Sequence, residues 1–146
     1  MRIAGHGVAV DLPAGWDGRI SQRQATGPVM HVATFPLLAS DGDYGASATG
    51  RMRGDDVFAA LLEFQGDARV RPGLGLFEAI RRPLPEVPEF GPMQLQVTRP
   101  GQLGWQRFFT ESGRALCLYA VIQPVRRPAP ELVAELRGVL ATIVFS

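Results

Sequence analysis

The segment RALCLYAVIQ, residues 114–123, constrains the fold most strongly, because apolar side chains occupy both of its faces. In a β-strand, alternate side chains point to opposite sides of the sheet. Cys117, Tyr119 and Val121 then lie on one side. The other side is equally apolar, with Leu116, Leu118, Ala120 and Ile122. A strand of this kind is typical of the centre of a sheet that is covered on both faces.

The preceding segment, residues 103–110, is expected to pair with this strand as a hairpin. The connection is Glu111-Ser112-Gly113, and Gly113 can adopt the positive φ that a tight turn needs. Connections between the clear strands are too short for the crossovers of a parallel sheet, so the sheet is predicted to be mainly antiparallel. Further strands are expected at 6–12, 19–25, 29–38, 44–52, 93–99 and 142–145, with 73–80 a further short candidate.

Two helices are predicted. The first covers 57–64, with Asp55 as its N-cap, an apolar stripe at helical spacing and Gly66 at its end. The second begins near Pro130, where a missing N–H costs nothing. Its apolar face consists of Leu132, Val133, Leu136, Val139 and Leu140. Between the two lies RRPLPEVPEFGP, residues 81–92, whose four prolines favour extended, polyproline-like backbone.

Length and composition indicate a single domain over residues 1–146 with an ordinary globular balance of 46% hydrophobic and 20% charged residues. The net charge of +1 argues against a nucleic-acid partner. All fifteen basic residues are arginine, and the chain has neither lysine nor asparagine. This bias is typical of a GC-rich genome and suggests an actinobacterial source. It also excludes a Walker A lysine and a lysine Schiff base.

The N-terminal segment MRIAGHGVAVDLPAGW lacks the continuous apolar stretch of a signal peptide. No apolar run approaches the roughly 20 residues that a membrane-spanning helix needs. The sequence therefore predicts a cytoplasmic protein without membrane insertion, although secretion without a cleavable signal stays open. The single cysteine is consistent with a reducing compartment.

The opening GVAVDLPAGW resembles the start of many PsbP-like domains. The matching positions are Val8, Val10, Leu12, Pro13, Gly15 and Trp16, and residues 131–145 suit the closing helix and strand of that fold. The resemblance implies an α+β fold in which an antiparallel sheet is flanked by helices as a three-layer α/β/α sandwich. It also implies a non-catalytic domain that binds other proteins. The segment GWQRFFTESGRALCLYAVI is similar to a group of uncharacterised actinobacterial proteins with Q-x-F-F-T-E-x-G-R and C-L-Y motifs.

Reactive residues are few and scattered. Cys117 lies in the apolar strand and is expected to be a buried, inert thiol, because a reactive thiolate needs exposure and a nearby base or positive charge. His6 and His31 have no metal-ligand spacing with each other or with Cys117, so neither a metal nor a cofactor is expected. Pairing of Cys117 with His31 in a pocket between sheet and helix remains the enzymatic or small-molecule alternative.

We therefore expect a non-enzymatic protein-binding or accessory module of a bacterial assembly. The candidate contacts are Trp16, Arg81, Arg82, Pro85, Val87, Pro88 and Phe90. The segment from Arg82 to Pro88 fits the Arg-x-x-Pro-x-x-Pro pattern that SH3 domains read, although a structural connector explains it as well. Trp16 is either a lid on the core or an exposed anchor. Self-assembly into a homo-oligomer, in which the last strand or a sheet edge pairs with a neighbouring copy, is the other alternative.

Overall fold

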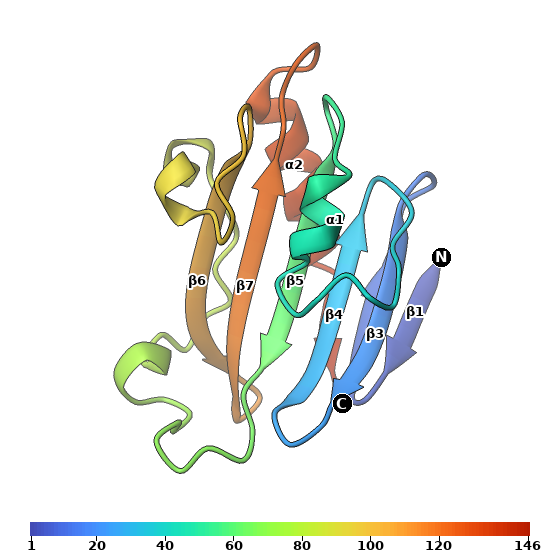
Figure 1. The fold of residues 1–146 in the computed structure, drawn as a ribbon. Helices are drawn as coiled ribbons and strands as arrows, with labels where there is room; N and C mark the ends of the chain where they lie inside the picture. The colour runs from blue at the N-terminus through green and yellow to red at the C-terminus, as the bar shows by residue number, and fades with distance from the viewer.

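The computed structural model describes residues 1–146, and its strands form two antiparallel sheets (Figure 1). The larger sheet has the order β3 (Asp17–Arg23), β4 (Gly27–Ala33), β5 (Val57–Glu63), β7 (Arg114–Ile122) and β6 (Leu103–Glu111). The smaller sheet has the order β1 (Arg2–Gly5), β2 (Val8–Asp11) and β8 (Val144–Phe145). The predicted α+β class with antiparallel sheets is confirmed.

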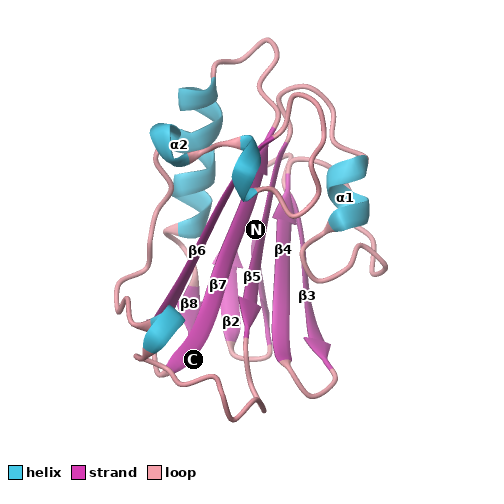
Figure 2. Ribbon diagram, turned by 60° about the vertical axis from the view of Figure 1, so that its left-hand side comes forward, coloured by secondary structure: helices cyan, strands magenta, loops and turns pink.

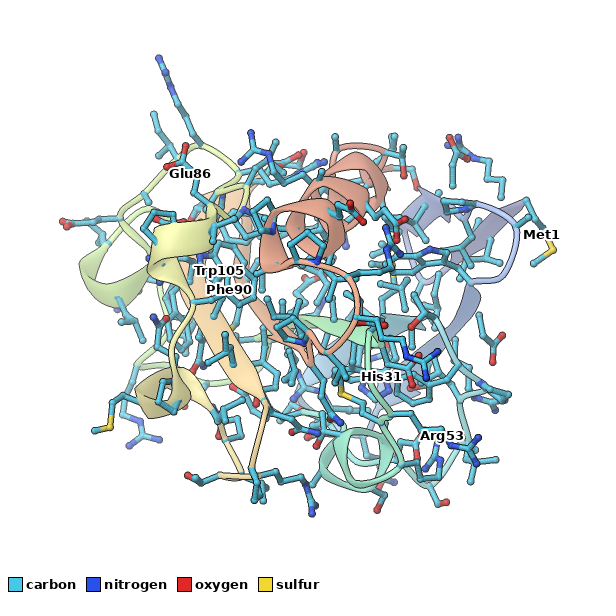
Figure 3. All side chains as sticks on the ribbon, turned by 90° about the horizontal axis from the view of Figure 1, so that it is seen from above. Met1, His31, Arg53, Glu86, Phe90 and Trp105 are labelled. Atoms are coloured by element: carbon cyan, nitrogen blue, oxygen red, sulfur yellow. The ribbon has the colours of Figure 1, made fainter.

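Both faces of the five-stranded sheet are covered. Figures 2 and 3 show helix α2 (Ala129–Leu140) on one side of this sheet and the short helix α1 (Ala46–Gly50) on the other. Under α2 and the smaller sheet lies a core of 20 buried residues, and under α1 and its flanking loops lies a second core of 11. Three short 3-10 helices lie before β6: η1 (Gly75–Phe77), η2 (Val87–Glu89) and η3 (Pro92–Gln94).

The β6–β7 hairpin forms as the sequence predicts. Glu111 pairs with Arg114, so the loop contains Ser112 and Gly113, whose φ angles are 52° and 71°. Positive φ at both loop residues is the geometry of the tight turn that best fits the right-handed twist of paired strands. Every residue of β7 after Arg114 is buried, and β7 lies between β5 and β6. The prediction of a central strand covered on both faces is confirmed.

The helix predicted over 57–64 is wrong, because this segment is strand β5. It pairs with β4 on one side and β7 on the other, and all seven of its residues are buried. Asp55 is not an N-cap. Its φ is 70°, and its carboxylate accepts the backbone N–H groups of Val125, Arg126 and Arg127. A short apolar run that is buried on both faces satisfies helical and strand spacing alike, and here tertiary pairing decides between them.

The strand expected over 44–52 is also wrong, because this segment contains α1. Ala48 and Thr49 of α1 are buried against the sheet. Gly45, which precedes the helix, has φ of 68° and lies so close to the Phe58 ring that a side chain there would collide with it. Small residues allow a short helix to lie flat on the sheet, and this close approach is what the Gly, Ala and Ser content of the segment provides.

The strand expected over 93–99 does not form. The segment contains the end of η3 and irregular chain. The nearest β-bridge lies just before it, between Gly91 and Gly104. The backbone N–H of Gln96 donates a hydrogen bond to the Tyr119 hydroxyl instead of to the backbone of a neighbouring strand. Residues 73–80 likewise contain η1 and no strand, and the 29–38 strand ends at Ala33.

The ends of the chain pack together. Strand β1, which the sequence did not predict, pairs with β2, and β2 pairs with the predicted closing strand β8. Helix α2 buries the predicted face against the main core. With twelve residues it is the longest helix, and no helix is long and apolar enough to cross a bilayer.

Candidate functional site

Most of the predicted contact residues are held in the folded body. Arg81 and Pro88 are exposed, whereas Pro85 is buried. The other four are partly buried: Trp16, Arg82, Val87 and Phe90. Three of them, Trp16, Val87 and Phe90, pack against the main core.

Side chains on both flanks fix the proline-rich segment. Arg82 donates to both carboxylate oxygens of Glu111 and, through Nη1, to the carbonyl oxygen of Leu140 at 3.0 Å. Arg137 of α2 donates to the carbonyl oxygens of Leu84 and Pro85. These bonds hold the segment against α2, so it works as a structural connector. Of the predicted contacts in this segment, only Arg81 and Pro88 are exposed to a partner.

Glu89 ties the end of this segment to β6. Phe90 stacks on Trp105 with ring centroids 6.4 Å apart (Figure 3). The Trp105 Nε1–H donates to Glu89 at 3.1 Å, and Arg107 forms an ion pair with Glu89. Burial by itself would raise the pKa of Glu89, but hydrogen bonds from the Glu86 backbone and Trp105, with the charge of Arg107, lower it. Glu89 is therefore a charged structural clamp.

Trp16 covers the edge of the core, in agreement with the lid interpretation. It is partly buried and packs against the main core. A shallow hollow of about 350 Å³ beside it is lined by Pro13, Thr34, Arg127 and Glu135. The two charged side chains of this hollow, Arg127 and Glu135, form an ion pair with each other.

The structure does not bring Cys117 and His31 together. Both side chains lie on the same face of the sheet, but Cys117 is opposite Leu62 and His31 is opposite Ala60. They are thus two strands and two residues apart, roughly 12 Å between Cα atoms. Cys117 is fully buried, and burial raises the pKa of its thiol to about 11. Nowhere do three His, Cys, Asp or Glu side chains gather so that they could hold a metal.

His31 lies at the base of a polar pocket of about 350 Å³. Residues of β3, β4 and the loop after β4 line this pocket, among them Arg19, Ser21, Leu38 and Asp43. Figure 3 shows His31 on the α1 side of the sheet, away from Trp105 and Phe90. The sequence analysis considered His31 only as a residue without metal-ligand spacing and as a possible partner of Cys117. A histidine in an otherwise apolar strand was the only signal of the pocket.

A second surface that the sequence did not single out is the leucine loop, residues 69–81. Its exposed apolar side chains are Leu74 (62%), Leu76 (64%) and Ile80 (75%). Leu74 and Leu76 border a hollow of about 450 Å³ that Arg69 and Arg71 also line. The alternation of glycine and leucine in PGLGLF was the available signal, because glycines leave no neighbouring side chain to cover the leucines.

The leucine loop is held rigidly against β6. The Thr110 hydroxyl accepts the N–H of Gly73 and donates to the carbonyl oxygen of Phe77, each at 2.7 Å. The N–H of Thr110 bonds to the carbonyl oxygen of Ala79. Phe77 is buried against Phe108, with ring centroids 5.7 Å apart. The loop thus turns one aromatic side chain inward and presents its leucines outward.

Comparison with known proteins adds no family. No family model, no curated protein and no solved structure matches the chain.

Proposed function

We propose that this chain is a non-enzymatic protein-binding or accessory module of a bacterial assembly, and that the leucine loop is its main contact surface. The exposure of Leu74, Leu76 and Ile80 within one anchored loop carries the proposal. Single exposed apolar residues are ordinary, but neighbouring ones that border a hollow, as Leu74 and Leu76 do, are typical of protein interaction sites. A preformed loop also loses little conformational entropy on binding.

Charge at the loop favours an acidic partner. Arg69 is paired with Asp67, but Arg71 and Arg81 have no ion-pair partner within the chain. Arginine next to exposed apolar side chains is the composition enriched at the centre of protein interfaces. Arg81 belongs to the contact set expected from the sequence, and Pro88 remains a proposed peripheral contact.

The separation of the reactive groups supports a role other than catalysis. Cys117 is buried with a raised pKa, and no imidazole reaches it. A nucleophile needs an adjacent base or a lowered pKa, and neither accompanies this thiol. We accordingly retain the non-enzymatic interpretation together with a cytoplasmic location.

For the fold we retain the finer proposal of a PsbP-like three-layer sandwich. The GVAVDLPAGW resemblance and the covering of both faces of the sheet support it. On one face the cover consists of a single five-residue helix and loops, which is thinner than a helical layer.

The experiment compares the native chain with Leu76→Glu in affinity purification from the source cells, with mass spectrometry of the retained proteins. The native chain should retain a specific protein, and Leu76→Glu should lose it. The matched control is Val125→Glu, at an apolar side chain that is 69% exposed in the loop before α2. Isolation of the native chain as a clean monomer, or equal retention by Leu76→Glu, would count against the proposal.

A further inference from the structure

The polar pocket at His31 is independent of the leucine loop. It lies at the β3 side of the five-stranded sheet, whereas the leucine loop is anchored on β6 at the opposite edge. Arg19 of β3 is directly opposite His31 of β4 in the strand register, so both side chains point to the same face. The loop after β4 forms the other wall, with Leu38, Ala39 and Asp43.

One ring nitrogen of His31 forms a hydrogen bond within the chain, and the other forms none. Nε2 lies 2.8 Å from the carbonyl oxygen of Asp43. A carbonyl oxygen only accepts, so Nε2 carries the proton and Nδ1 has the lone pair. Nδ1 has no partner in the chain, and it is not among the sealed, unpartnered side-chain atoms, which are Arg99 Nε and Gln102 Oε1. It is therefore not completely sealed, and His31 lines the pocket although the residue as a whole is only 8% exposed.

The imidazole is neutral at pH 7. Burial lowers the pKa of His31 below its ordinary value of 6.5 and outweighs the opposing effects of the Asp43 carbonyl and of the nearby Asp41 and Asp43 charges. The positive charge of Arg19 adds to the lowering. A neutral ring with its proton on Nε2 offers Nδ1 as a hydrogen-bond acceptor.

The pocket contains one arginine that forms no ion pair within the chain. The Asp41 carboxylate is bound by Arg51 at 2.5 Å, and the Asp43 carboxylate is paired with Arg23 at 3.3 Å. Each of these two acids thus has an arginine partner, while Arg19 has no ion pair. Because no carboxylate of the chain forms a salt bridge with Arg19, its guanidinium is available to a ligand anion.

We propose that this pocket binds a small organic acid that carries a hydroxyl group, with the carboxylate at Arg19 and the hydroxyl donating to His31 Nδ1. The Ser21 hydroxyl, which has no hydrogen-bond partner in the chain, supplies a second polar contact. A volume of about 350 Å³ is sufficient for such a molecule. A simple carboxylate satisfies Arg19 but leaves the imidazole lone pair without a donor, which weakens its binding.

The test is ¹⁵N NMR of the histidine side chains in the full chain, which has two histidines. The probes are lactate and malate, compared with propionate and succinate, which differ from them only by the hydroxyl group. Lactate or malate should shift the ¹⁵N resonance of His31 Nδ1 saturably in the millimolar range. Propionate should bind about tenfold more weakly than lactate, and succinate about tenfold more weakly than malate. His6, which is exposed in a turn, should not shift and serves as the internal control.

Two arginine variants separate binding from nonspecific charge effects. Arg19→Gln should weaken lactate or malate binding about tenfold. Arg53→Gln, at an exposed arginine outside the pocket, should leave it unchanged. Absence of a saturable His31 shift with both hydroxy acids, equal binding of the acids without a hydroxyl, or unchanged binding in Arg19→Gln would each overturn the proposal. None of these results depends on the leucine loop, so the proposed function is tested separately.

Discussion

The two ionisable residues that the chain buries most completely, Cys117 and Asp41, are stabilised in opposite protonation states. Burial raises the pKa of Cys117, whose thiol has the Gln106 amide and the Tyr44 hydroxyl as hydrogen-bonding neighbours. Asp41 is buried as well, but it remains charged because Arg51 and the Leu38 N–H bind its carboxylate. The difference lies in the partners that each group finds, because burial alone favours the neutral form of both.

Cys117 should react slowly with thiol reagents in the native protein. Its pKa of about 11 leaves almost no thiolate at pH 7, and the side chain is fully buried. Labelling with iodoacetamide at pH 7, followed by mass spectrometry, should be slow until denaturant is added and fast afterwards. Rapid labelling of the native protein that His31→Ala abolishes would instead establish the cysteine–histidine alternative.

Asp41→Asn should destabilise the protein by about 2 kcal/mol at pH 7, because Arg51 loses its charged partner. Burial by itself would raise the pKa of Asp41, but the bonds from Arg51 and Leu38 lower it below its ordinary value of 3.8. The stabilisation is therefore present above about pH 4 and is lost as the pH falls through the lowered pKa.

Urea unfolding at several pH values measures this effect. The difference between the native chain and Asp41→Asn should shrink below pH 4. Asp43→Asn is the matched control, because the Asp43 side chain is 55% exposed and its pair with Arg23 contributes little. A destabilisation that is equally large in Asp43→Asn, or that stays constant down to pH 2, would contradict the prediction.

At the scale of elements, sequence patterns identified the β6–β7 hairpin, helix α2 and the closing strand β8, but they missed β1 and assigned β5 to a helix. The β6–β7 hairpin is specified by its own turn at Ser112 and Gly113, and α2 by its apolar face. Strand β5 pairs with strands that are distant in sequence, and its apolar run fits helix and strand equally. The small residues of α1 gave no helical pattern in the sequence. Their role is the close approach of this segment to Phe58, which only the folded structure shows.

Glu89 should be essential for docking the proline-rich segment on β6. Glu89→Ala leaves the Trp105 N–H, in a fully buried side chain, without an acceptor and removes the ion pair of Arg107. We expect a loss of about 1–2 kcal/mol in the free energy of unfolding, measured by circular dichroism in urea. Glu78→Ala, at an exposed glutamate with no ion pair in the same region, should change it very little.

At the scale of the whole molecule, the candidate sites were less predictable than the fold. From the sequence, most partner contacts were expected at residues 81–90, where prolines prevent regular structure. In the structure, hydrogen bonds of Arg137 and Arg82 hold most of this segment against the folded body. The pocket requires Arg19, His31 and Asp43 to meet from separate segments, and no spacing rule connects them. Exposure and convergence are properties of the packed chain, so local patterns indicate them poorly.

The two edges of the five-stranded sheet are unequal. On β6, bonds with Gly91, Ala79 and the Gln94 side chain occupy outward backbone groups of Gly104, Gln106 and Thr110. No strand pairs with the outer edge of β3, which touches β1 only through side chains such as those beside Gly5 and Gly18. Copies of the chain that joined through this sheet would have a single free edge each. Such an association would close as a twofold pair, because a fibre needs a second edge from which to grow.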